Sequence, residues 1–380
     1  MILASRNIRK RLWIDTDVGF DDLVAIWCVL AGGIRSTHVK ISTVGGVSTA
    51  NDGAAALRSF LPATQSVLKG LETSSSTRDE PEWLPRSRRS FQDFARKHRS
   101  SQTGAVATTG RSDKRQNKAG SLTETPQEDT LTMEGKHQSD AGSADVLLSS
   151  PDKGGGCAGP CESEFASFLG QWEDAVQDDA GRGDTASPAG NSRNESPIPP
   201  VDILCLGPLT NLASWMQLMN SHDEHIAAIW MLGGNLGDRD VAEFNFSWDP
   251  HAVQQVFDAA VACKIRLIPG EVSDRAYVMR QLGDMDDFIA TLPHHDDAAT
   301  VDLRSILQWD DYGLFSDPVC AYVMEYPDVA QWDTRHVVVD EHGCLHEGTK
   351  ESAQIQIATQ IDLSGYLAWL KDRAAPSVGK

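Results

Sequence analysis

The sequence predicts an α/β fold in which helices flank a mostly parallel central sheet within a single domain. The first observation is that short, continuous apolar runs alternate with stretches of helical spacing, beginning with residues 12–14 and 23–31. Continuous apolar runs are typical of strands that are buried on both faces. The second is that Gly-containing turns follow several of these runs, as at 45–46 and 233–235. Strand–helix repeats of this kind join parallel strands through right-handed crossovers.

In the N-terminal part, strands are expected at 12–14, 39–44 and 66–68, and helices at 23–31 and 51–60. Strand and helix alternate without interruption over these residues. This βαβαβ order is typical of a parallel sheet in which each helix carries the chain back to the same end.

Two low-complexity segments interrupt the domain, which we expect to extend over residues 10–372. Residues 73–162 are rich in Ser, Thr, Gly, Gln and charge and have little apolar periodicity, and 177–200 is a second loose segment. Neither can bury enough apolar surface to offset the entropy of ordering the chain. We therefore expect a long disordered insert, with the fold resuming briefly at 164–176, where the apolar spacing is helical.

The C-terminal part returns to strong signals. Apolar runs followed by turn residues predict four strands, and helical spacing predicts four helices. The strands are expected at 201–206, 226–232, 265–268 and 337–339, and the helices at 210–219, 250–261, 319–324 and 363–370. Residues 288–309 give no clear pattern.

Composition excludes several classes of partner. The formal net charge is −20 and the pI is about 4.9, which argues against nucleic acid and against an anionic membrane surface. The seven cysteines are odd in number, and Cys28, Cys205 and Cys320 lie in apolar runs typical of buried thiols. There is no signal-peptide pattern and no apolar run of about 18 residues, so we expect a soluble cytoplasmic protein.

Four aspartates, Asp15, Asp17, Asp21 and Asp22, lie between the first predicted strand and the first predicted helix. This is where open α/β sheets bind ligands, and clustered carboxylates suit a hard cation such as Ca²⁺ or Mg²⁺. Two alternatives remain open. One is a solvated acidic turn with a capping aspartate. The other is a phosphatase of the haloacid dehalogenase type, which also begins with an apolar run and Asp-x-Asp.

Further polar side chains follow later elements, namely Thr210, Asn211, Glu243, Asn245 and Asp317. If these converge at one edge of the sheet, they form a pocket of carboxylates and amides. Such a pocket suits a cation together with a polyhydroxyl ligand, since both groups hydrogen-bond to sugar hydroxyls. Taken singly, each pattern also fits a capped helix start or a polar edge strand.

The motifs are Asp-Thr-Asp-Val-Gly-Phe-Asp-Asp at 15–22, Gly-Pro-Leu-Thr-Asn-Leu-Ala at 207–213, Ala-Glu-Phe-Asn-Phe at 242–246 with Asp-Pro at 249–250, and Ser-Asp-Pro at 316–318. In this order they resemble the inosine–uridine-preferring nucleoside hydrolases. The resemblance covers about 10–72 and 201–372. It implies a nucleoside-hydrolase-like, Rossmann-like fold and Ca²⁺-dependent hydrolysis of ribonucleosides to free base and ribose. Because family members are usually dimers or tetramers, it also implies a homo-oligomer.

The resemblance assigns metal binding to four positions. Asp17, Asp22, Asp317 and the main-chain carbonyl of Thr210 would be ligands. Asp17 would also act as the general base toward a water whose pKa the metal lowers. Asp15 would support this loop from behind.

The resemblance also assigns substrate contacts. Asp21 and Asn245 would bind the 2′ and 3′ hydroxyls of the ribose, and Glu243 would contact its 5′ side. A wall of carboxylates favours the oxocarbenium-like ribosyl cation that forms as the glycosidic bond breaks.

The sequence departs from the family pattern at several positions. Ser316 stands where the family usually has a histidine that protonates the leaving base, and Gly46 stands where it usually has an asparagine. Leu232 replaces the methionine that usually lies under the ribose. Asn235 and Asp238 are both candidates for the asparagine that precedes the Glu-Phe-Asn motif.

The missing histidine leaves three hypotheses. Trp309 and Tyr312 could activate the base by stacking, as in purine-preferring relatives, which favours a purine-leaning enzyme. His294 or His295 could donate the proton instead. The third hypothesis is a catalytically weak or inactive relative that binds ribosides. The same side chains also fit ordinary roles, as packed aromatic residues or solvated histidines.

Overall fold

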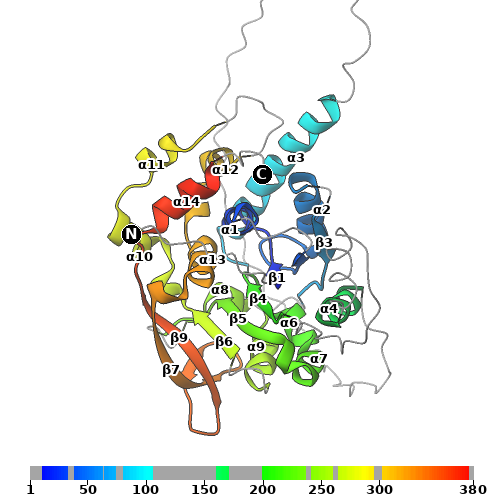
Figure 1. Cartoon of the computed structure of the whole chain (residues 1–380), viewed down its shortest axis with the longest axis vertical. Coiled ribbons are helices and arrows are strands. Elements are labelled where there is room, and N and C mark those ends of the chain that lie inside the picture. The colour runs from blue at the N-terminus through cyan, green and yellow to red at the C-terminus, as the bar shows by residue number, and fades with distance from the viewer. Residues whose placement is uncertain are drawn as a thin grey trace, which may run out of the picture. The chain divides into compact units, whose positions relative to one another are not determined.

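A mixed β-sheet forms the centre of the computed structural model, which describes residues 11–32, 38–62, 64–73, 80–105, 160–170, 199–236, 241–259, 264–294 and 302–375 (Figure 1). Within these residues the sheet has nine strands in the order β3-β2-β1-β4-β5-β6-β9-β7-β8. Neighbours from β3 to β9 pair in parallel, whereas β7 pairs antiparallel with both β9 and β8. The strands are β1 (Arg11–Thr16), β2 (Val39–Thr43), β3 (Ser66–Lys69), β4 (Val201–Cys205), β5 (Ile226–Leu232), β6 (Ile265–Ile268), β7 (Ala330–Val339), β8 (Leu345–Glu347) and β9 (Ala353–Ile361).

The direction in which the sheet grows reverses at β1. Strands β2 and β3 extend it to one side of β1, and β4, β5 and β6 extend it to the other. Asp15, near the carboxyl end of β1, pairs with Ser42 of β2 and Cys205 of β4. A crevice at the carboxyl ends of the strands, where the order reverses, is the usual ligand site of such sheets. The topology therefore places the aspartate motif at the expected crevice.

Helices cover both faces of the sheet because its strands are apolar on both sides. Along β1, Leu12 and Ile14 pack into one hydrophobic core and Trp13 into the other, since successive side chains point to opposite faces. The first core includes α1 (Phe20–Ala31), α2 (Ala50–Phe60), α3 (Leu84–Ala105), α10 (Arg275–Leu282), α11 (Asp286–Thr291), α12 (Leu303–Trp309), α13 (Asp317–Glu325) and α14 (Tyr366–Ala374). The second includes α4 (Pro160–Gly170), α6 (Thr210–Ser214), α7 (Met216–Ser221), α8 (Phe244–Trp248) and α9 (Pro250–Phe257). Short 3-10 turns lie at η2 (Asp223–His225), η4 (Gly270–Val272), η5 (Asp311–Leu314) and η6 (Pro327–Val329).

The α/β fold class is confirmed, and the expected elements differ from the structure mainly near the C-terminus. The strand expected at 337–339 is the end of the longer strand β7, and β8 and β9 were not expected from the pattern. Strand β9 buries Ile355 and Ile357 but leaves Gln354 and Gln356 partly or fully exposed, so it lacks the continuous apolar run of the parallel strands. The helix expected at 210–219 is two short helices, α6 and α7.

Helix α3 lies inside 73–162, the range expected to be without regular structure. Its side chains Leu84, Phe91 and Phe94 are buried in the structure. They form a narrow apolar stripe at helical spacing. The many Arg, Ser and Gln residues around them make the segment look polar when only its composition is considered. The expectation of disorder is therefore wrong for 84–105, while 106–159 and 171–198 lie outside the described residues.

None of the helices in the described ranges has the length and hydropathy needed to cross a bilayer. Cys28, Cys205 and Cys320 are buried free thiols, as their apolar neighbours predict.

Candidate active site

The turn between β1 and α1 is held by hydrogen bonds that its own side chains and backbone make to Asp22. The Thr16 hydroxyl donates to Asp22 Oδ1, and the Gly19 amide donates to Asp22 Oδ2 at 2.7 Å. Between them Val18 has a φ of 61°, which is a rare conformation for a β-branched residue. Strain of this kind persists where the surroundings fix it, and it clusters at functional sites.

Asp17 is fixed by the loop that follows β2. The Val47 amide donates to Asp17 Oδ2 at 2.7 Å, and the Ser48 amide donates to the Asp17 carbonyl at 3.0 Å. A Cβ atom on Gly46 would lie 2.1 Å from Asp17 Oδ2. Glycine at position 46, where the family usually has asparagine, suits this loop because no side chain fits beside Asp17.

Asp15 lies beneath the cavity and does not line it. Its Oδ1 accepts hydrogen bonds from the Ser42 hydroxyl at 2.5 Å and from Asn211 Nδ2 at 2.8 Å. Asn211 Oδ1 in turn accepts from the Leu71 amide at 2.7 Å. Burial raises the pKa of Asp15 to about 7. Through these bonds Asp15 of β1 is joined to Ser42 of β2 and to Asn211 of α6.

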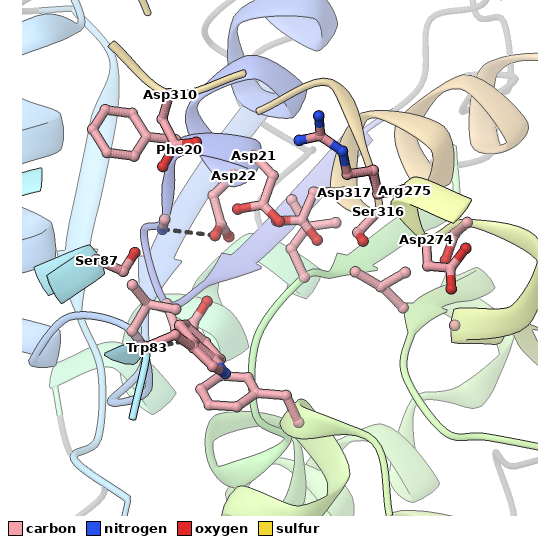
Figure 2. Close-up of a pocket in the computed structure, with 18 of the residues that line it drawn as sticks. Phe20, Asp21, Asp22, Trp83, Ser87, Asp274, Arg275, Asp310, Ser316 and Asp317 are labelled. Atoms are coloured by element: carbon pink, nitrogen blue, oxygen red, sulfur yellow. Dashed lines mark hydrogen bonds between the residues drawn. The ribbon is translucent and has the colours of Figure 1, made fainter. Parts of the chain in front are cut away.

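Three carboxylates from two helices meet at the cavity floor. Carboxylate oxygens of Asp21, Asp22 and Asp317 lie within 4.8 Å of one another, and Figure 2 shows these side chains converging. Burial raises the pKa of Asp317 well above its usual range, and the charges of the neighbouring aspartates raise it further. The same causes raise the pKa of Asp17. Ionised together, these groups repel one another strongly.

Asp317 carries the most informative atom of the site. The side chain is 2% exposed, and in the described part of the chain its buried Oδ1 has no hydrogen-bond partner. Asp317 begins α13, directly after Ser316, whose φ of 60° lies in the left-handed region. The Ser316 amide donates to the Ser273 carbonyl at 2.8 Å. A strained turn thus precedes a buried carboxylate that lies among the other aspartates and has one oxygen unsatisfied.

Thr210 does not line the cavity. Its hydroxyl donates to Asp249 Oδ2 at 2.6 Å, at the start of α9. The loop that precedes it does approach the site, because a Cβ atom on Gly207 would lie 2.8 Å from the Asp17 amide nitrogen. The structure thus places this loop next to Asp17. The role of the Thr210 carbonyl as a metal ligand stays a prediction.

Glu243 and Asn245 line the opposite side of the cavity, at the start of α8. Glu243 Oε2 accepts from the Gly234 and Phe246 amides, both at 3.2 Å, and burial raises its pKa to about 6. Asn245 Nδ2 donates to the Leu206 carbonyl at 2.9 Å. These bonds hold both side chains in fixed orientations, although α8 is a short helix and not an edge strand.

These walls enclose a cavity of about 1380 Å³. Of the residues selected from sequence, those that line it are Asp17, Asp21, Asp22, Leu232, Asn235, Glu243, Asn245, Trp309, Ser316 and Asp317. Lining residues that sequence reasoning missed include Trp83, Arg86, Ser87, Phe244, Arg275 and Arg304. The apolar stripe of α3 was the available signal for the first three. The alternative candidate Asp238 and the side chain of Tyr312 lie outside the described residues.

Trp309 and Trp83 both line the cavity but differ in how far their side chains are held by neighbouring residues. Trp309 Nε1 donates to the Ser90 carbonyl at 3.1 Å, and its ring packs against Phe94 with centroids 5.5 Å apart. Trp309 is therefore part of the contact between α12 and α3. Trp83 is 49% exposed, and its ring lies 5.2 Å from that of Phe244. Figure 2 shows Trp83 across the cavity from the aspartates.

Among the described residues, no histidine lines the cavity. His294 is an exposed residue whose Nδ1 lies 3.3 Å from Asp302 Oδ2. His295 lies outside the described residues. Within the described ranges, Ser316 therefore has no histidine beside it in the cavity lining.

The fold and the site together define a class of α/β protein. Its sheet is open, and carboxylates line the crevice at the point where the strand order reverses. The model of the inosine-uridine preferring nucleoside hydrolase family matches residues 12–368. The chain belongs to this family.

Individual relatives are distant. The non-specific ribonucleoside hydrolase RihC of Escherichia coli is 24% identical over 196 residues, which is 46% of this chain and 60% of that protein. The inosine-uridine preferring nucleoside hydrolase of Bacillus anthracis has a TM-score of 0.56 at 15% identity, covering 96% of this chain and 99% of its own. The purine-preferring ribonucleoside hydrolase of Gardnerella vaginalis has a TM-score of 0.52 at 17% identity, with coverages of 96% and 98%. At these identities the structures share the fold.

Proposed function

We propose that this chain hydrolyses the N-glycosidic bond of ribonucleosides, releasing free base and ribose, and that it requires Ca²⁺. The observation that carries the proposal is the buried, unpartnered Oδ1 of Asp317, whose carboxylate is grouped with those of Asp21 and Asp22 in a cavity that Asp17 also lines. An unpartnered carboxylate oxygen beside other carboxylates is costly unless a cation is bound. Membership of the nucleoside hydrolase family supports the same activity.

The residues fit Ca²⁺. Its oxygen ligands lie about 2.3–2.6 Å from the ion, so two of them can be about 5 Å apart, in keeping with the 4.8 Å grouping of Asp21, Asp22 and Asp317. We propose Asp22 and Asp317 as ligands, together with Asp17 and the Thr210 carbonyl. When bound, the cation would lower the pKa of a coordinated water.

The remaining roles follow from position. Asp17, held by the Val47 amide through one oxygen, accepts the proton of the attacking water through the other. Asp21, the least buried of the three clustered aspartates, binds the ribose 2′ and 3′ hydroxyls with Asn245. Glu243 contacts the 5′ side. Contacts that strengthen as positive charge develops on the ribosyl group accelerate the reaction.

We propose Trp83 as the side chain that stacks on the base, in place of Trp309; a contribution from Tyr312 stays a prediction. Trp83 exposes half of its surface at the cavity wall and has Phe244 beside it, whereas Trp309 is engaged with α3. Stacking grows with ring area, which favours purines over pyrimidines. Preference for purine nucleosides is therefore part of the proposal.

The second candidate function is riboside binding with weak catalysis. It is favoured by Ser316, which cannot protonate a leaving base near neutral pH. The haloacid dehalogenase alternative has no support from the family match. Ribonucleosides remain the proposed small-molecule partner, and assembly into a homo-oligomer stays a prediction.

The test is reducing-sugar release from inosine, adenosine, guanosine, uridine and cytidine, with Ca²⁺ and with a chelator. The variant is Asp17→Ala, and the matched control is Asp258→Asn, an exposed aspartate at the end of α9. We expect release that requires Ca²⁺, that is lost in Asp17→Ala and that persists in the control. Binding of inosine without release by a folded, Ca²⁺-saturated protein would favour the second candidate instead.

A further inference from the structure

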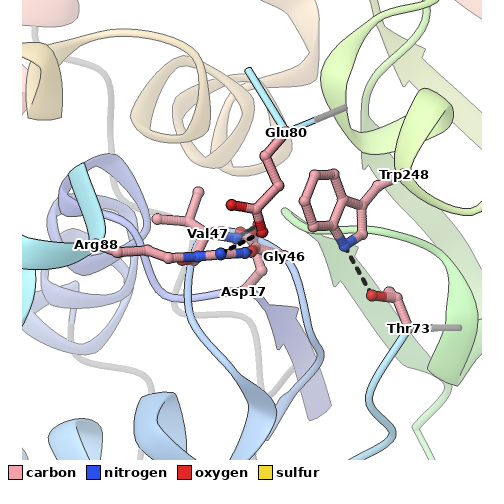
Figure 3. Close-up of polar contacts among 7 residues, drawn as sticks. All are labelled: Asp17, Gly46, Val47, Thr73, Glu80, Arg88 and Trp248. Carbon is pink, nitrogen blue, oxygen red and sulfur yellow. Dashed lines mark hydrogen bonds and ion pairs between the residues drawn. The ribbon is translucent and has the colours of Figure 1, made fainter. Parts of the chain in front are cut away.

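Arg88 of α3 uses all three guanidinium nitrogens near the cavity. Its Nη2 donates to the Gly46 carbonyl and its Nε to the Val47 carbonyl, both at 2.8 Å. Its Nη1 donates to Glu80 Oε1 at 2.5 Å. Figure 3 shows Arg88 lying between Glu80 and the loop that carries Gly46 and Val47.

The Gly46 carbonyl and the Val47 amide belong to the same peptide group. One end of that group accepts from Arg88, and the other donates to Asp17 Oδ2 at 2.7 Å. In a planar trans peptide the C=O and N–H bonds point in opposite directions. A guanidinium that fixes the oxygen therefore also aims the N–H at Asp17, and the two bonds polarise one another.

This peptide group needs a restraint because glycine precedes it. Rotation of the peptide plane changes ψ of Gly46 and φ of Val47, and glycine opposes such a rotation least. A rotated plane would point the Gly46 carbonyl at the Asp17 carboxylate. The space beside Asp17 allows no side chain at this position, so the restraint has to come from another element.

Arg88 is itself firmly placed. Three residues farther along α3, Phe91 is 2% exposed, and its ring packs against Phe20 of α1 with centroids 5.7 Å apart. Phe94 packs against the same ring at 5.5 Å. On its other side the Arg88 guanidinium lies 5.8 Å from the ring of Trp248. Helix α3 is thus anchored on the helix that carries Asp21 and Asp22.

We propose that Arg88 is a positioning residue that holds the Gly46–Val47 peptide in the orientation required by Asp17. Its kinetic consequences depend on the proposed hydrolase activity, while its structural consequence does not. The acceptors of Arg88 are two successive carbonyls and one carboxylate. Binding all three requires the planar, forked set of donors of a guanidinium, which lysine lacks. The geometry of the guanidinium, and not its charge alone, is the required property.

The test compares Arg88→Ala and Arg88→Lys with Arg89→Ala, which removes the exposed neighbouring arginine of the same helix. The first measurement is amide hydrogen exchange in peptides that cover residues 44–49, which needs no activity. We expect exchange at the Val47 amide to accelerate about 10-fold or more in both Arg88 variants and to stay unchanged in Arg89→Ala. The unfolding temperature of each variant is recorded as a check on folding.

The second measurement is nucleoside hydrolysis at saturating Ca²⁺. A misplaced catalytic group costs up to about 100-fold, so we expect kcat to fall about 30- to 100-fold with KM changed less than about 3-fold. Guanidinium chloride at about 20 mM should partly restore kcat in Arg88→Ala, where it can enter the emptied site, and not in Arg88→Lys, where a side chain fills it.

The outcomes separate the two proposals. Wild-type protein that releases no sugar overturns the proposed function and leaves the exchange experiment to decide the role of Arg88. Wild-type exchange at 44–49 in a folded Arg88→Lys variant overturns the positioning role. Full activity of Arg88→Lys overturns it as well, since charge alone would then suffice.

Discussion

The two walls of the cavity are built from different kinds of element. The carboxylate wall comes from β1, α1 and α13, elements of the sheet and its first hydrophobic core, and its acids are fixed by backbone amides or left unpartnered. The opposite, helical wall comes partly from α3, which is attached through the rings of Phe91 and Phe94. That wall contributes an exposed ring, Trp83, directly before α3. Helix α3 also supplies Arg88, whose guanidinium binds the loop beside Asp17.

Chemistry and positioning are thus supplied by separate parts of the chain. The proposed general base, Asp17, directly follows β1, where it is buried and its orientation is set by main-chain hydrogen bonds. The groups proposed to orient the base and Asp17, which are Trp83 and Arg88, come from the start of α3 and the turn before it, in the segment between β3 and β4. The carboxylate wall should therefore be intolerant of any change, whereas the helical wall should tune rate and preference.

The largest expected effect is that of Asp317→Asn. Activity should fall about 1000-fold or more, because a proposed Ca²⁺ ligand is lost. The Ca²⁺-free protein should nevertheless unfold at a higher temperature than the wild type, since burial and the neighbouring aspartates oppose ionisation of Asp317 and the amide carries no such cost. Sugar release and thermal unfolding in a chelator measure the two effects, with Asp258→Asn as the control. A lower unfolding temperature for the chelated variant would contradict the assignment of Oδ1 as an unsatisfied atom.

Gly46→Ala tests the junction between the two walls. Its Cβ atom would lie 2.1 Å from Asp17 Oδ2, so either the loop or the carboxylate has to move. We expect kcat to fall about 100-fold and stability to fall by about 2 kcal/mol, measured by initial rates and urea unfolding. Wild-type kcat at unchanged stability would show that the loop has more room than the structure gives it.

Trp83→Ala tests the helical wall alone. Stacking on an aromatic ring contributes about 1–3 kcal/mol per base, so KM for inosine and guanosine should rise about 10-fold, and KM for uridine less. Trp83→Phe should retain most of the affinity. Trp309→Phe should lower the unfolding temperature, through loss of its bond to Ser90, with little change in KM. The reverse pattern for the two tryptophans would return the stacking role to Trp309.

The smallest effect concerns pH and Glu243. Burial raises the pKa of Glu243 from 4.5 to about 6, so between these values the folded protein holds a proton that the unfolded chain has lost. The free energy of unfolding therefore falls as pH rises through this window. In Glu243→Gln, the decrease in the free energy of unfolding between pH 4.5 and pH 7 should be smaller by about 1–2 kcal/mol. Urea unfolding at the two pH values, in a chelator, measures the difference. An unaltered pH dependence would indicate that Glu243 is solvated in the folded protein.

Much of the carboxylate wall could be predicted because its information is local. Asp15 to Asp22 follow an apolar strand and precede an apolar helix, and the alternation of strand and helix fixes the end of the sheet at which they lie. Local pattern could not predict whether the ring of Trp309 is free to stack on a base. Its bond to Ser90 joins residues 219 positions apart, and no local pattern encodes such a contact.

The α/β class, most of the parallel strands and the convergence of the aspartates could be predicted from the chain alone, because apolar runs and periodicity report burial within each element. The place of α3 beside the cavity, the exposed ring of Trp83 and the hydrogen bonds of Arg88 to the loop beside Asp17 became known from the folded structure. These features depend on where one helix packs against others distant in sequence. Its few apolar side chains become informative only when the surface that receives them is known.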